Sequence, residues 1–382
     1  MMRIMPGAML GVVGGGQLGR MFVQAAQQMG YLVTVLDSAT DSPAGPIAND
    51  FICADFADQS ALEKLATRCA AITTEFENIP ADSLRRLAKS CRVSPDADSV
   101  AIAQNRVLEK QFLVNSGFAV APFAIIARHE DIFTIEMADL LPGILKVSQF
   151  GYDGKGQKTV ADQAQLIAAY AHLNQPVCVL EKFMPLKYEV SVVVARGSDG
   201  DIKTFPVSEN QHANGILDIS IVPARIPQQL AQQAQAIACQ VVERLNYQGV
   251  LCVEFFVLQN DELLINEIAP RPHNSGHYSI NACITSQFEQ QVRSLCGLPL
   301  GETTQHSAAA MVNLLGELWQ YGEPNWNLVL RHSFAKLHLY GKAEARPGRK
   351  MGHFTVLSAS TEVALQQALH IKKQLHHSHM QS

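Results

Sequence analysis

The stretch VLCVEFFVLQNDELLINEIAPRPHNSGH, residues 250–277, is the most informative part of the sequence about the fold of this chain. Residues 250–258 and 263–269 are mainly β-branched, aromatic and aliphatic, a composition that is typical of strands. Asn260-Asp261 stands between the two runs, and both residue types accept the positive φ angle of a tight turn. The stretch therefore predicts a β-hairpin that turns at Asn260-Asp261.

Two carboxylates interrupt these apolar strands. A turn centred on Asn260-Asp261 places Glu254 directly opposite Glu267. Facing carboxylates repel each other, and burial strengthens the repulsion. A shared proton, a solvated face or a hard cation such as Mg²⁺ would each relieve it, and Mg²⁺ accepts one or two carboxylates together with phosphate oxygens and water. Of these three alternatives, the pattern favours a metal.

The composition indicates an ordered globular protein of 382 residues, enough for two or three domains. The 30 basic and 35 acidic residues leave a net charge of −5, which argues against nucleic-acid binding and against electrostatic membrane binding. No apolar run approaches the ~18 residues of a membrane span. The eight cysteines form no CxxC pair, so we expect reduced thiols in a cytoplasmic protein.

The N-terminal region reads as a strand at 9–13, the turn and helix start GGGQLGRM at 14–21, and a strand at 32–37 that ends in Asp37. This order is typical of a dinucleotide-binding fold, in which a helix N-terminus receives a phosphate. A nicotinamide or flavin enzyme is the natural first hypothesis. The alternative is a glycine turn that serves only tight helix–sheet packing.

The segment TTEFENIP, residues 73–80, follows the same alternation of strands and helices. It places Glu75, Glu77 and Asn78 at the carboxyl end of a strand, which is the edge where open α/β sheets bind ligands. Acids that cap the next helix are the alternative interpretation. We expect the first domain to end near residue 100.

The middle of the chain carries cations in a pattern that suits phosphate. A polar helix is expected at 98–116, with Arg106 and Lys110, and a strand at 143–147 contains Lys146. The loop QFGYDGKGQ that follows could close over phosphates, although it lacks the GK[ST] of a Walker loop. Two further predicted strands bear Glu181 and Glu189. We expect residues 120–190 to form a small α+β lid.

The C-terminal third begins with helices expected at 230–245 and 278–296, before and after the hairpin. A final module contains YGKAEARPGRKMGH at 340–353, in which four basic residues are separated by proline and glycine. This loop predicts an anion site, with a solvated turn as the alternative. Its basic residues are Lys342, Arg346, Arg349 and Lys350.

Five motifs in one order carry a family resemblance: GGGQLGRM, TTEFENIP, GYDGKGQ, INEIAPRPHNSGH and RPGRKMGH, between residues 14 and 353. Together they resemble the ATP-grasp ligases, and most closely the 5-(carboxyamino)imidazole ribonucleotide synthases of purine biosynthesis. The resemblance implies an α/β and α+β fold with ATP-grasp architecture. It would comprise an N-terminal doubly wound parallel-sheet domain (1–102), an ATP-grasp domain (103–300) with the central lid, and a small C-terminal mixed-sheet domain (301–382).

The same resemblance implies an activity. ATP, bicarbonate and 5-aminoimidazole ribonucleotide would give N5-carboxyaminoimidazole ribonucleotide, ADP and phosphate by way of carboxyphosphate. ATP and Mg²⁺ would be the cofactors, and the protein would be a cytoplasmic homodimer without nucleic-acid or membrane partners.

Site residues follow by position from the motifs. ATP would contact Arg106, Lys146, the loop residues Gly151, Tyr152, Asp153, Gly154, Lys155, Gly156 and Gln157, then Glu181, Lys182, Phe183, Met184, Glu189, His212, Asn266 and Glu267. Glu254 and Glu267 would bind Mg²⁺. The ribonucleotide would contact Gln17, Leu18, Glu75, Asn274, Lys342, Arg349 and Lys350. Asp153, Arg271, His273 and Lys350 are the catalytic candidates, orienting bicarbonate and handling the proton.

The chain departs from the family pattern directly after Lys146, where Val147, Ser148 and Gln149 replace the usual basic residues. Three other functions compete with the carboxylase. Another ATP-grasp ribonucleotide ligase, such as the formate-dependent glycinamide ribonucleotide transformylase, would share the hairpin carboxylates. A nicotinamide oxidoreductase would use only the first 100 residues, and a non-catalytic nucleotide-binding module would not need the retained charges.

Overall fold

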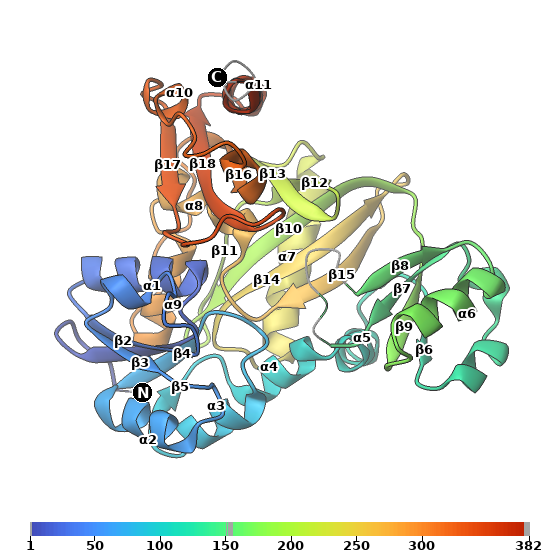
Figure 1. The fold of residues 1–382 in the computed structure, drawn as a ribbon, viewed down its shortest axis with the longest axis horizontal. Helices are drawn as coiled ribbons and strands as arrows, with labels where there is room; N and C mark the ends of the chain where they lie inside the picture. Colours follow the sequence, from blue (N-terminus) through green and yellow to red (C-terminus); the bar gives the residue numbers. More distant parts are fainter. Residues whose placement is uncertain (1, 150, 152–155, 378–382) are drawn as a thin grey trace.

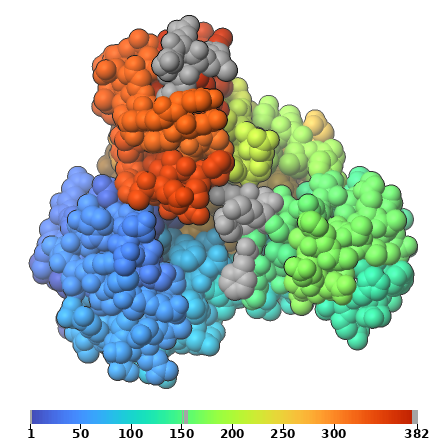
Figure 2. Space-filling model, viewed as in Figure 1, coloured from blue at the N-terminus to red at the C-terminus, as the bar shows by residue number. Residues whose placement is uncertain are grey.

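A computed structural model describes residues 2–149, 151 and 156–377 of the chain (Figure 1). Three lobes surround a hollow in the space-filling view: the N-terminal domain in blue, the lid in green and the C-terminal module in orange and red (Figure 2). No helix within the described ranges is long and apolar enough to span a membrane.

The N-terminal domain is a parallel sheet in the order β3-β2-β1-β4-β5, as predicted for a doubly wound fold. Strand order reverses between β1 and β4, so their carboxyl ends form the edge where such sheets bind ligands. The strands are β1 Met9–Val13, β2 Leu32–Asp37, β3 Asp50–Cys53, β4 Ala71–Thr74 and β5 Arg92–Val93. The helices are α1 Gln17–Gln28, α2 Gln59–Arg68, α3 Ala81–Leu87 and α4 Ala97–Gln104.

One helix of this domain comes from much later in the chain. On α9 (Gln287–Cys296), Val292, Leu295 and Cys296 are buried in the same core as Leu10 and Phe22 of the first domain. Helices α1 and α9 therefore cover one face of the sheet, while α2, α3 and α4 cover the other. The first domain is packed firmly against the middle of the chain.

A nine-stranded sheet forms the body of the molecule, in the order β15-β14-β10-β12-β13-β16-β18-β17, with β11 on β10. The C-terminal strands continue this sheet through the β13–β16 pair and are antiparallel, where the sequence predicts a mixed sheet. Reversing connections between neighbouring strands favour antiparallel pairing. The strands of the nine-stranded sheet are β10 Leu186–Arg196, β11 Ile202–Thr204, β12 Ser208–Ala213, β13 Ile216–Val222, β14 Gly249–Leu258, β15 Leu263–Ala269, β16 Ala308–Leu315, β17 Ala335–Leu339 and β18 Lys350–Ser358.

The lid is a separate four-stranded antiparallel sheet in the order β6-β9-β7-β8, covered by α6 (Gln163–His172). The main sheet is covered by α7 (Gln228–Arg244) and α11 (Thr361–His377). The lid strands are β6 Phe123–Ile126, β7 Gly143–Val147, β8 Gln157–Val160 and β9 Cys178–Lys182. The remaining helices are α5 Arg106–Asn115, α8 Ser279–Ala282 and α10 Asn327–Leu330.

Three local predictions need correction. The helix expected at 98–116 is two helices, because Asn105 ends α4 and its side chain caps α5 by accepting hydrogen bonds from Val107 and Leu108. The helix expected at 278–296 is interrupted between α8 and α9. Sequence analysis also missed the β12–β13 hairpin, although Asn214-Gly215, with φ angles of 53° and 78°, is a strong hairpin-turn signal.

Candidate active site

The structure confirms that Glu254 and Glu267 face each other across β14 and β15. The turn differs from the prediction: Leu258 N donates to Glu262 O at 2.9 Å, so three residues form the loop, and Asp261 has a φ of 63°. In that register Glu254 would face Asn266. A β-bulge next to Phe255 shifts the pairing by one residue and brings Glu267 opposite Glu254.

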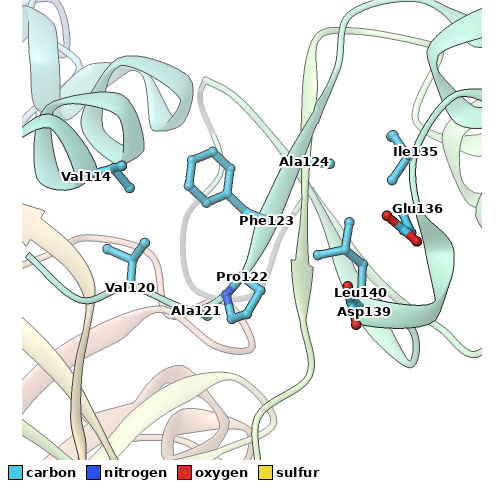
Figure 3. Close-up of a pocket in the computed structure, with 10 residues that line it drawn as sticks. All are labelled: Val114, Val120, Ala121, Pro122, Phe123, Ala124, Ile135, Glu136, Asp139 and Leu140. Carbon is cyan, nitrogen blue, oxygen red and sulfur yellow. The ribbon is translucent and has the colours of Figure 1, made fainter.

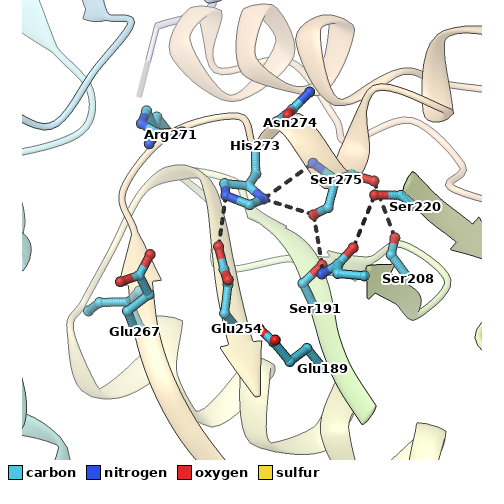
Figure 4. Close-up of polar contacts among 12 residues, drawn as sticks. Glu189, Ser191, Ser208, Ser220, Glu254, Glu267, Arg271, His273, Asn274 and Ser275 are labelled. Atoms are coloured by element: carbon cyan, nitrogen blue, oxygen red, sulfur yellow. Dashed lines mark hydrogen bonds and ion pairs between the residues drawn. The ribbon is translucent and has the colours of Figure 1, made fainter. Parts of the chain in front are cut away.

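Each hairpin carboxylate has its own cationic partner. Glu254 Oε1 lies 2.8 Å from His273 Nε2 (Figure 4). Glu267 Oε2 lies 3.2 Å from Arg106 Nη2. Burial acts to raise the pKa of Glu254, but His273 outweighs it and lowers the pKa to about 2. In this structure, separate cations relieve the repulsion that the sequence indicates.

His273 is a buried imidazolium. Burial acts to lower its pKa, but the neighbouring Cys252 sulfur and the Glu254 carboxylate raise it to about 10. The other ring nitrogen, Nδ1, lies 2.8 Å from Ser275 Oγ, and Ser275 Oγ lies 2.7 Å from Ser191 Oγ on β10 (Figure 4). His273 is therefore a fixed positive charge at neutral pH.

Three cations converge on Glu181 at the junction of lid and body. Glu181 Oε2 lies 3.0 Å from Lys146 Nζ and 3.4 Å from Lys110 Nζ, and Oε1 lies 3.8 Å from Arg106 Nη1. Burial acts to raise the pKa of Glu181, but these cations lower it to about 2. The predicted phosphate contacts Arg106 and Lys146 thus lie together, with Glu181 between them.

Lys110 was noted on the predicted helix but was not among the predicted ATP contacts. Its side chain is fully buried and donates from Nζ to the main-chain oxygen of Asn266 at 3.0 Å. The neighbouring Glu109 accepts from Ile268 N at 2.6 Å. These two bonds flank Glu267 on the bulged strand. Lys110 follows Arg106 by four residues and therefore lies on the same face of a helix, which was the available signal in the sequence.

Glu189 and His212 lie together on neighbouring strands β10 and β12, with Glu189 Oε2 3.2 Å from His212 Nδ1. Burial acts to lower the pKa of His212, but the hydrogen bond to Glu189 outweighs it and raises the pKa. The predicted ribose and nucleotide contacts are thus adjacent, on the strands next to the hairpin.

The lid carries the rest of the predicted ATP contacts. Lys182 is the last residue of β9, and Phe183 and Met184 follow it. Phe183 is 51% exposed and presents an accessible aromatic face at the strand end. Gly151, Gly156 and Gln157 are described, while Tyr152, Asp153, Gly154 and Lys155 lie outside the described residues. Where the chain departs from the family pattern, the Ser148 main-chain oxygen accepts from Arg106 N at 2.8 Å.

Acidic side chains occupy the glycine turn of the first domain. Glu75 accepts from Gly16 N at 2.6 Å and from Gly19 N at 2.8 Å, and Asp37 accepts from Gly15 N at 2.5 Å. Burial raises the pKa of Glu75, and the Asp37 carboxylate adds to the effect. A dinucleotide would need these donors, so the nicotinamide-type hypothesis loses its support. The sequence prediction of Glu75 at this edge is confirmed in position.

The basic loop of the C-terminal module lies against this edge. Tyr340 packs with Leu18 of α1, and the Lys342 charge acts on Glu75. Lys342 Nζ donates to the Lys350 main-chain oxygen at 2.7 Å, and Arg349 Nη1 donates to Glu344 O at 2.8 Å. The predicted ribonucleotide contacts Gln17, Leu18, Glu75, Lys342, Arg349 and Lys350 therefore come from two lobes that meet here.

Asn274 and Arg271 each join parts of the molecule that are distant in sequence. The Asn274 and Asn313 amides exchange two hydrogen bonds, of 3.0 and 2.7 Å. Arg271 forms an ion pair with Glu77 from the segment after β4. In this structure both side chains are held by protein partners.

A small polar cavity of about 70 Å³ lies where these elements meet. Such a volume has room for several water molecules or a small anion. Its lining comes from the first domain, α5, the lid loop and the hairpin, and includes Glu77, Arg106, Ser148, Gly151, Glu267 and Arg271.

A larger hollow of about 520 Å³ lies elsewhere, between Val114 of α5 and the lid residues Phe123 and Leu140 (Figure 3). Its lining is mostly apolar and contains no basic side chain. It offers nothing that would hold a phosphate, so the smaller polar cavity is the candidate reaction centre.

Comparison with known protein families supports this assignment. Residues 111–288 match the ATP-grasp domain family, residues 7–104 the ribonucleotide synthetase preATP-grasp domain, and residues 309–367 the phosphoribosylaminoimidazole carboxylase C-terminal domain. The fold and site thus define an ATP-grasp ligase.

Individual relatives narrow the family. The N5-carboxyaminoimidazole ribonucleotide synthase of Bacillus subtilis is 43% identical over 95% of each chain. A solved N5-carboxyaminoimidazole ribonucleotide synthetase in complex with ADP is 42% identical, with a TM-score of 0.92 over 100% of both chains. The Aspergillus clavatus enzyme, in complex with ADP and 5-aminoimidazole ribonucleotide, is 29% identical, with a TM-score of 0.88 over 97% of this chain and 98% of that chain. This chain belongs to the N5-carboxyaminoimidazole ribonucleotide synthase family.

Proposed function

We propose that this chain couples ATP cleavage to the carboxylation of 5-aminoimidazole ribonucleotide by bicarbonate, in the cleft between its three lobes. One observation carries the proposal: two separate cationic regions flank the carboxylate hairpin and His273. One region surrounds Glu181, and the other is the basic loop at 340–350. A nucleotide needs one such region, and the phosphate of an acceptor ribonucleotide needs the second.

The ATP side would use the cations around Glu181. Arg106 and Lys146 would hold the phosphates, assisted by Lys110 and covered by the loop Gly151–Gln157 of the lid. Residues Glu181, Lys182, Phe183 and Met184 would line the adenine, while Glu189 and His212 would face the ribose. Cations of this kind stabilise the equatorial oxygens of a transferring phosphoryl group.

The hairpin has oxygen ligands that fit Mg²⁺. Glu254 and Glu267 face each other, and the buried Oδ1 of Asn266 beside them has no hydrogen-bond partner. No group of three or more His, Cys, Asp and Glu residues in the described part of the chain could hold a metal, so phosphate oxygens and water would complete the octahedron. The ion would supply charge neutralisation at the transferring phosphoryl group.

The acceptor side would bind the ribonucleotide between two lobes. Lys342, Arg349 and Lys350 would take its 5′-phosphate, with Gln17, Glu75 and Asn274 around the remainder. Because the Leu18 side chain packs against Tyr340, its contact would be through the main chain. The glycine turn would then approach a substrate rather than a dinucleotide.

The reaction proceeds in two transfers. A bicarbonate oxygen bonds to the γ-phosphorus as the bond to ADP breaks, which gives carboxyphosphate. The amine then bonds to its carbon, the carbon–oxygen bond to phosphate breaks, and the amine loses a proton. The intermediate hydrolyses in water, so the lid has to exclude solvent.

His273 and Arg271 would orient bicarbonate as cations. The raised pKa of His273, about 10, keeps it protonated at neutral pH and therefore unsuited to act as a base. Lys350 would add charge from the acceptor side, and Asp153 of the lid loop is the proposed proton acceptor.

The test is ADP release with ATP, Mg²⁺ and ¹⁴C-bicarbonate, with and without 5-aminoimidazole ribonucleotide. The ribonucleotide should stimulate ADP formation and become labelled. Absence of both effects would contradict the proposal, and activity with formate and glycinamide ribonucleotide instead would indicate the transformylase.

We also infer a cytoplasmic homodimer without nucleic-acid or membrane partners. All eight cysteines are free thiols, which suits a reducing compartment. The dimer rests on the family resemblance, and light scattering after size exclusion should give twice the mass of the 382-residue chain.

A further inference from the structure

Helix α9 carries three glutamines whose side chains are buried. Gln287 and Gln290 are 0% exposed and Gln291 is 6% exposed. A buried amide without partners costs free energy, and each of these amides is hydrogen bonded to another segment. Their partners lie in three different parts of the molecule.

Gln287 holds the main chain of His273 from both sides. Its Oε1 accepts from His273 N at 2.8 Å, and its Nε2 donates to His273 O at 2.8 Å. The same Nε2 lies 3.0 Å from His277 Nδ1. One side chain therefore fixes the segment that aims the His273 imidazolium at Glu254.

Gln291 lies one helical turn further along and reaches the acceptor side. Its Nε2 donates to Thr73 Oγ1 at 3.0 Å and to Thr74 O at 3.3 Å. These are the last two residues of β4, directly before Glu75. The amide thus supports the strand end that presents Glu75 to the glycine turn.

The helix that carries these two amides is anchored in the first domain just beyond Gln291. Val292, Leu295 and Cys296 are buried in the core of the first domain. Main-chain bonds add to this, since Ile4 N donates to Cys296 O at 2.9 Å and Arg92 Nη1 to Leu295 O at 3.2 Å. A close-packed core resists deformation, so the two ends of this helix keep a fixed separation.

We propose that α9 sets the spacing between the site of bicarbonate activation and the acceptor ribonucleotide, with Gln287 and Gln291 as positioning residues for carboxyl transfer. The inference rests on the proposed function. Transfer requires the amine and the activated carbon at about 3–3.5 Å, and a misplacement of about 1 Å can cost roughly 100-fold in rate. A carboxyphosphate held out of reach of the amine hydrolyses, so ATP is consumed without product.

Gln290 provides a matched control on the same helix. It also clamps one residue from both sides: Gly301 N donates to its Oε1 at 2.9 Å, and its Nε2 donates to Gly301 O at 2.7 Å. Gln287→Met and Gln290→Met each remove two such main-chain bonds from a fully buried position, and Gln287→Met also removes the contact with His277. The two variants differ in the residue whose main chain loses these bonds. Gln287→Met affects His273, and Gln290→Met affects Gly301, which lies outside the proposed site.

The experiment measures ADP formed per ribonucleotide labelled by ¹⁴C-bicarbonate, together with the melting temperature of the wild type and each variant. We expect similar losses of melting temperature in both variants. Gln287→Met should raise the ADP-to-product ratio at least about threefold and lower the carboxylation rate roughly 10- to 100-fold. Gln290→Met should keep the wild-type ratio, and Gln291→Met should raise the ratio together with the KM for the ribonucleotide.

A Gln287→Met ratio equal to that of Gln290→Met would overturn the inference while leaving the proposed function intact. If Gln287→Met shows no cooperative melting, Gln291→Met decides instead, by the same ratio and by the KM for the ribonucleotide. Full coupling in that variant would also overturn the inference. A wild type that transfers no label would contradict the proposed function itself.

Discussion

The cations around Glu181 share one carboxylate, whereas Lys342 and Arg349 of the 340–350 loop donate to main-chain oxygens. Lys110 and Lys146 lie 3.4 and 3.0 Å from Glu181 Oε2. Arg349 and Lys342 instead donate to the carbonyls of Glu344 and Lys350. Lys110 and Lys146 are buried, whereas Lys342 and Arg349 are half-buried.

Because of this difference, the two cationic regions should respond differently to phosphate. Buried cations need a counter-charge when no ligand is bound, and Glu181 supplies it. Lys342 and Arg349 are oriented by carbonyls and half-buried, so they create a positive field that attracts an anion and is screened by salt. Loss of charge should therefore disrupt structure in the first region and affinity in the second.

The largest expected effect is the loss of turnover when a hairpin carboxylate between the two cationic regions is replaced. Glu267→Gln should lower kcat at least about 100-fold, as expected when one electrostatic group is removed from a reaction centre. The melting temperature should stay close to wild type, because this side chain is 37% exposed. Steady-state kinetics and thermal melting check both points, with Glu262→Gln on the same hairpin as the control. Near-normal turnover at ordinary Mg²⁺ would remove Glu267 from the proposed site.

The second largest expected effect is the loss of stability when the Glu181 counter-charge is removed. Glu181→Gln leaves buried cations uncompensated, which typically costs about 3–5 kcal/mol in the free energy of unfolding. Its pKa is lowered to about 2 in the folded protein. The contribution of Glu181 is therefore complete above about pH 4.3, the ordinary value for glutamate, and is lost as the pH falls towards 2.

Urea unfolding of the wild type and Glu181→Gln between pH 7 and pH 3 measures this contribution. The difference between the two proteins should shrink towards acid pH. A difference that does not change with pH would show that Glu181 acts through packing rather than charge.

Loss of a charge in the basic loop should change the affinity for the ribonucleotide and not the stability of the fold. Lys350→Ala should raise the KM for the ribonucleotide about tenfold, leave the KM for ATP nearly unchanged and barely alter the melting temperature, because one charge-assisted phosphate contact is lost. Initial rates with each substrate varied in turn provide the measurement. Arg346→Ala is the control in the same loop, since Arg346 is exposed and pairs with Glu344. A raised KM for ATP instead would misplace the acceptor phosphate.

The smallest effect concerns three neighbouring histidine rings beside the basic loop. The His338 and His353 rings are 4.5 Å apart and the His277 and His353 rings 5.0 Å apart, between centroids. Burial lowers the pKa of all three, and that of His277 and His353 lies well below the ordinary value. Their neutral burial contributes fully to stability above about pH 6.5, and this contribution is lost as the pH falls below that value.

His353→Asn tests this titration, because the asparagine oxygen can still accept from the Tyr340 hydroxyl, now 2.9 Å from His353 Nδ1. Urea unfolding at pH 5 and pH 7 should show a smaller loss of stability at pH 5 than in the wild type. The exposed His172→Asn should behave like the wild type. Equal acid sensitivity in all three proteins would contradict neutral burial of His353.

Much of the site could be predicted from residues close together in the chain. Lys146 in an apolar strand, the facing pair Glu254 and Glu267, and Glu75 at a strand end all occupy the predicted positions. Residue roles at these positions stay predictions. The pairing of Glu254 with Glu267 was correct although the assumed turn was not, because the bulge compensates for the shifted loop.

Hydrophobic periodicity, turn residues and charged positions act over a few residues, so most helices and strands could be predicted from the sequence. Only the tertiary structure decided which elements meet. Lys110 reaches the main chain of Asn266, and Gln291 reaches Thr73, across 156 and 218 residues of sequence. Such contacts depend on topology, and no local pattern encodes a partner so distant. For the same reason α9 reads as part of the middle domain but completes the core of the first.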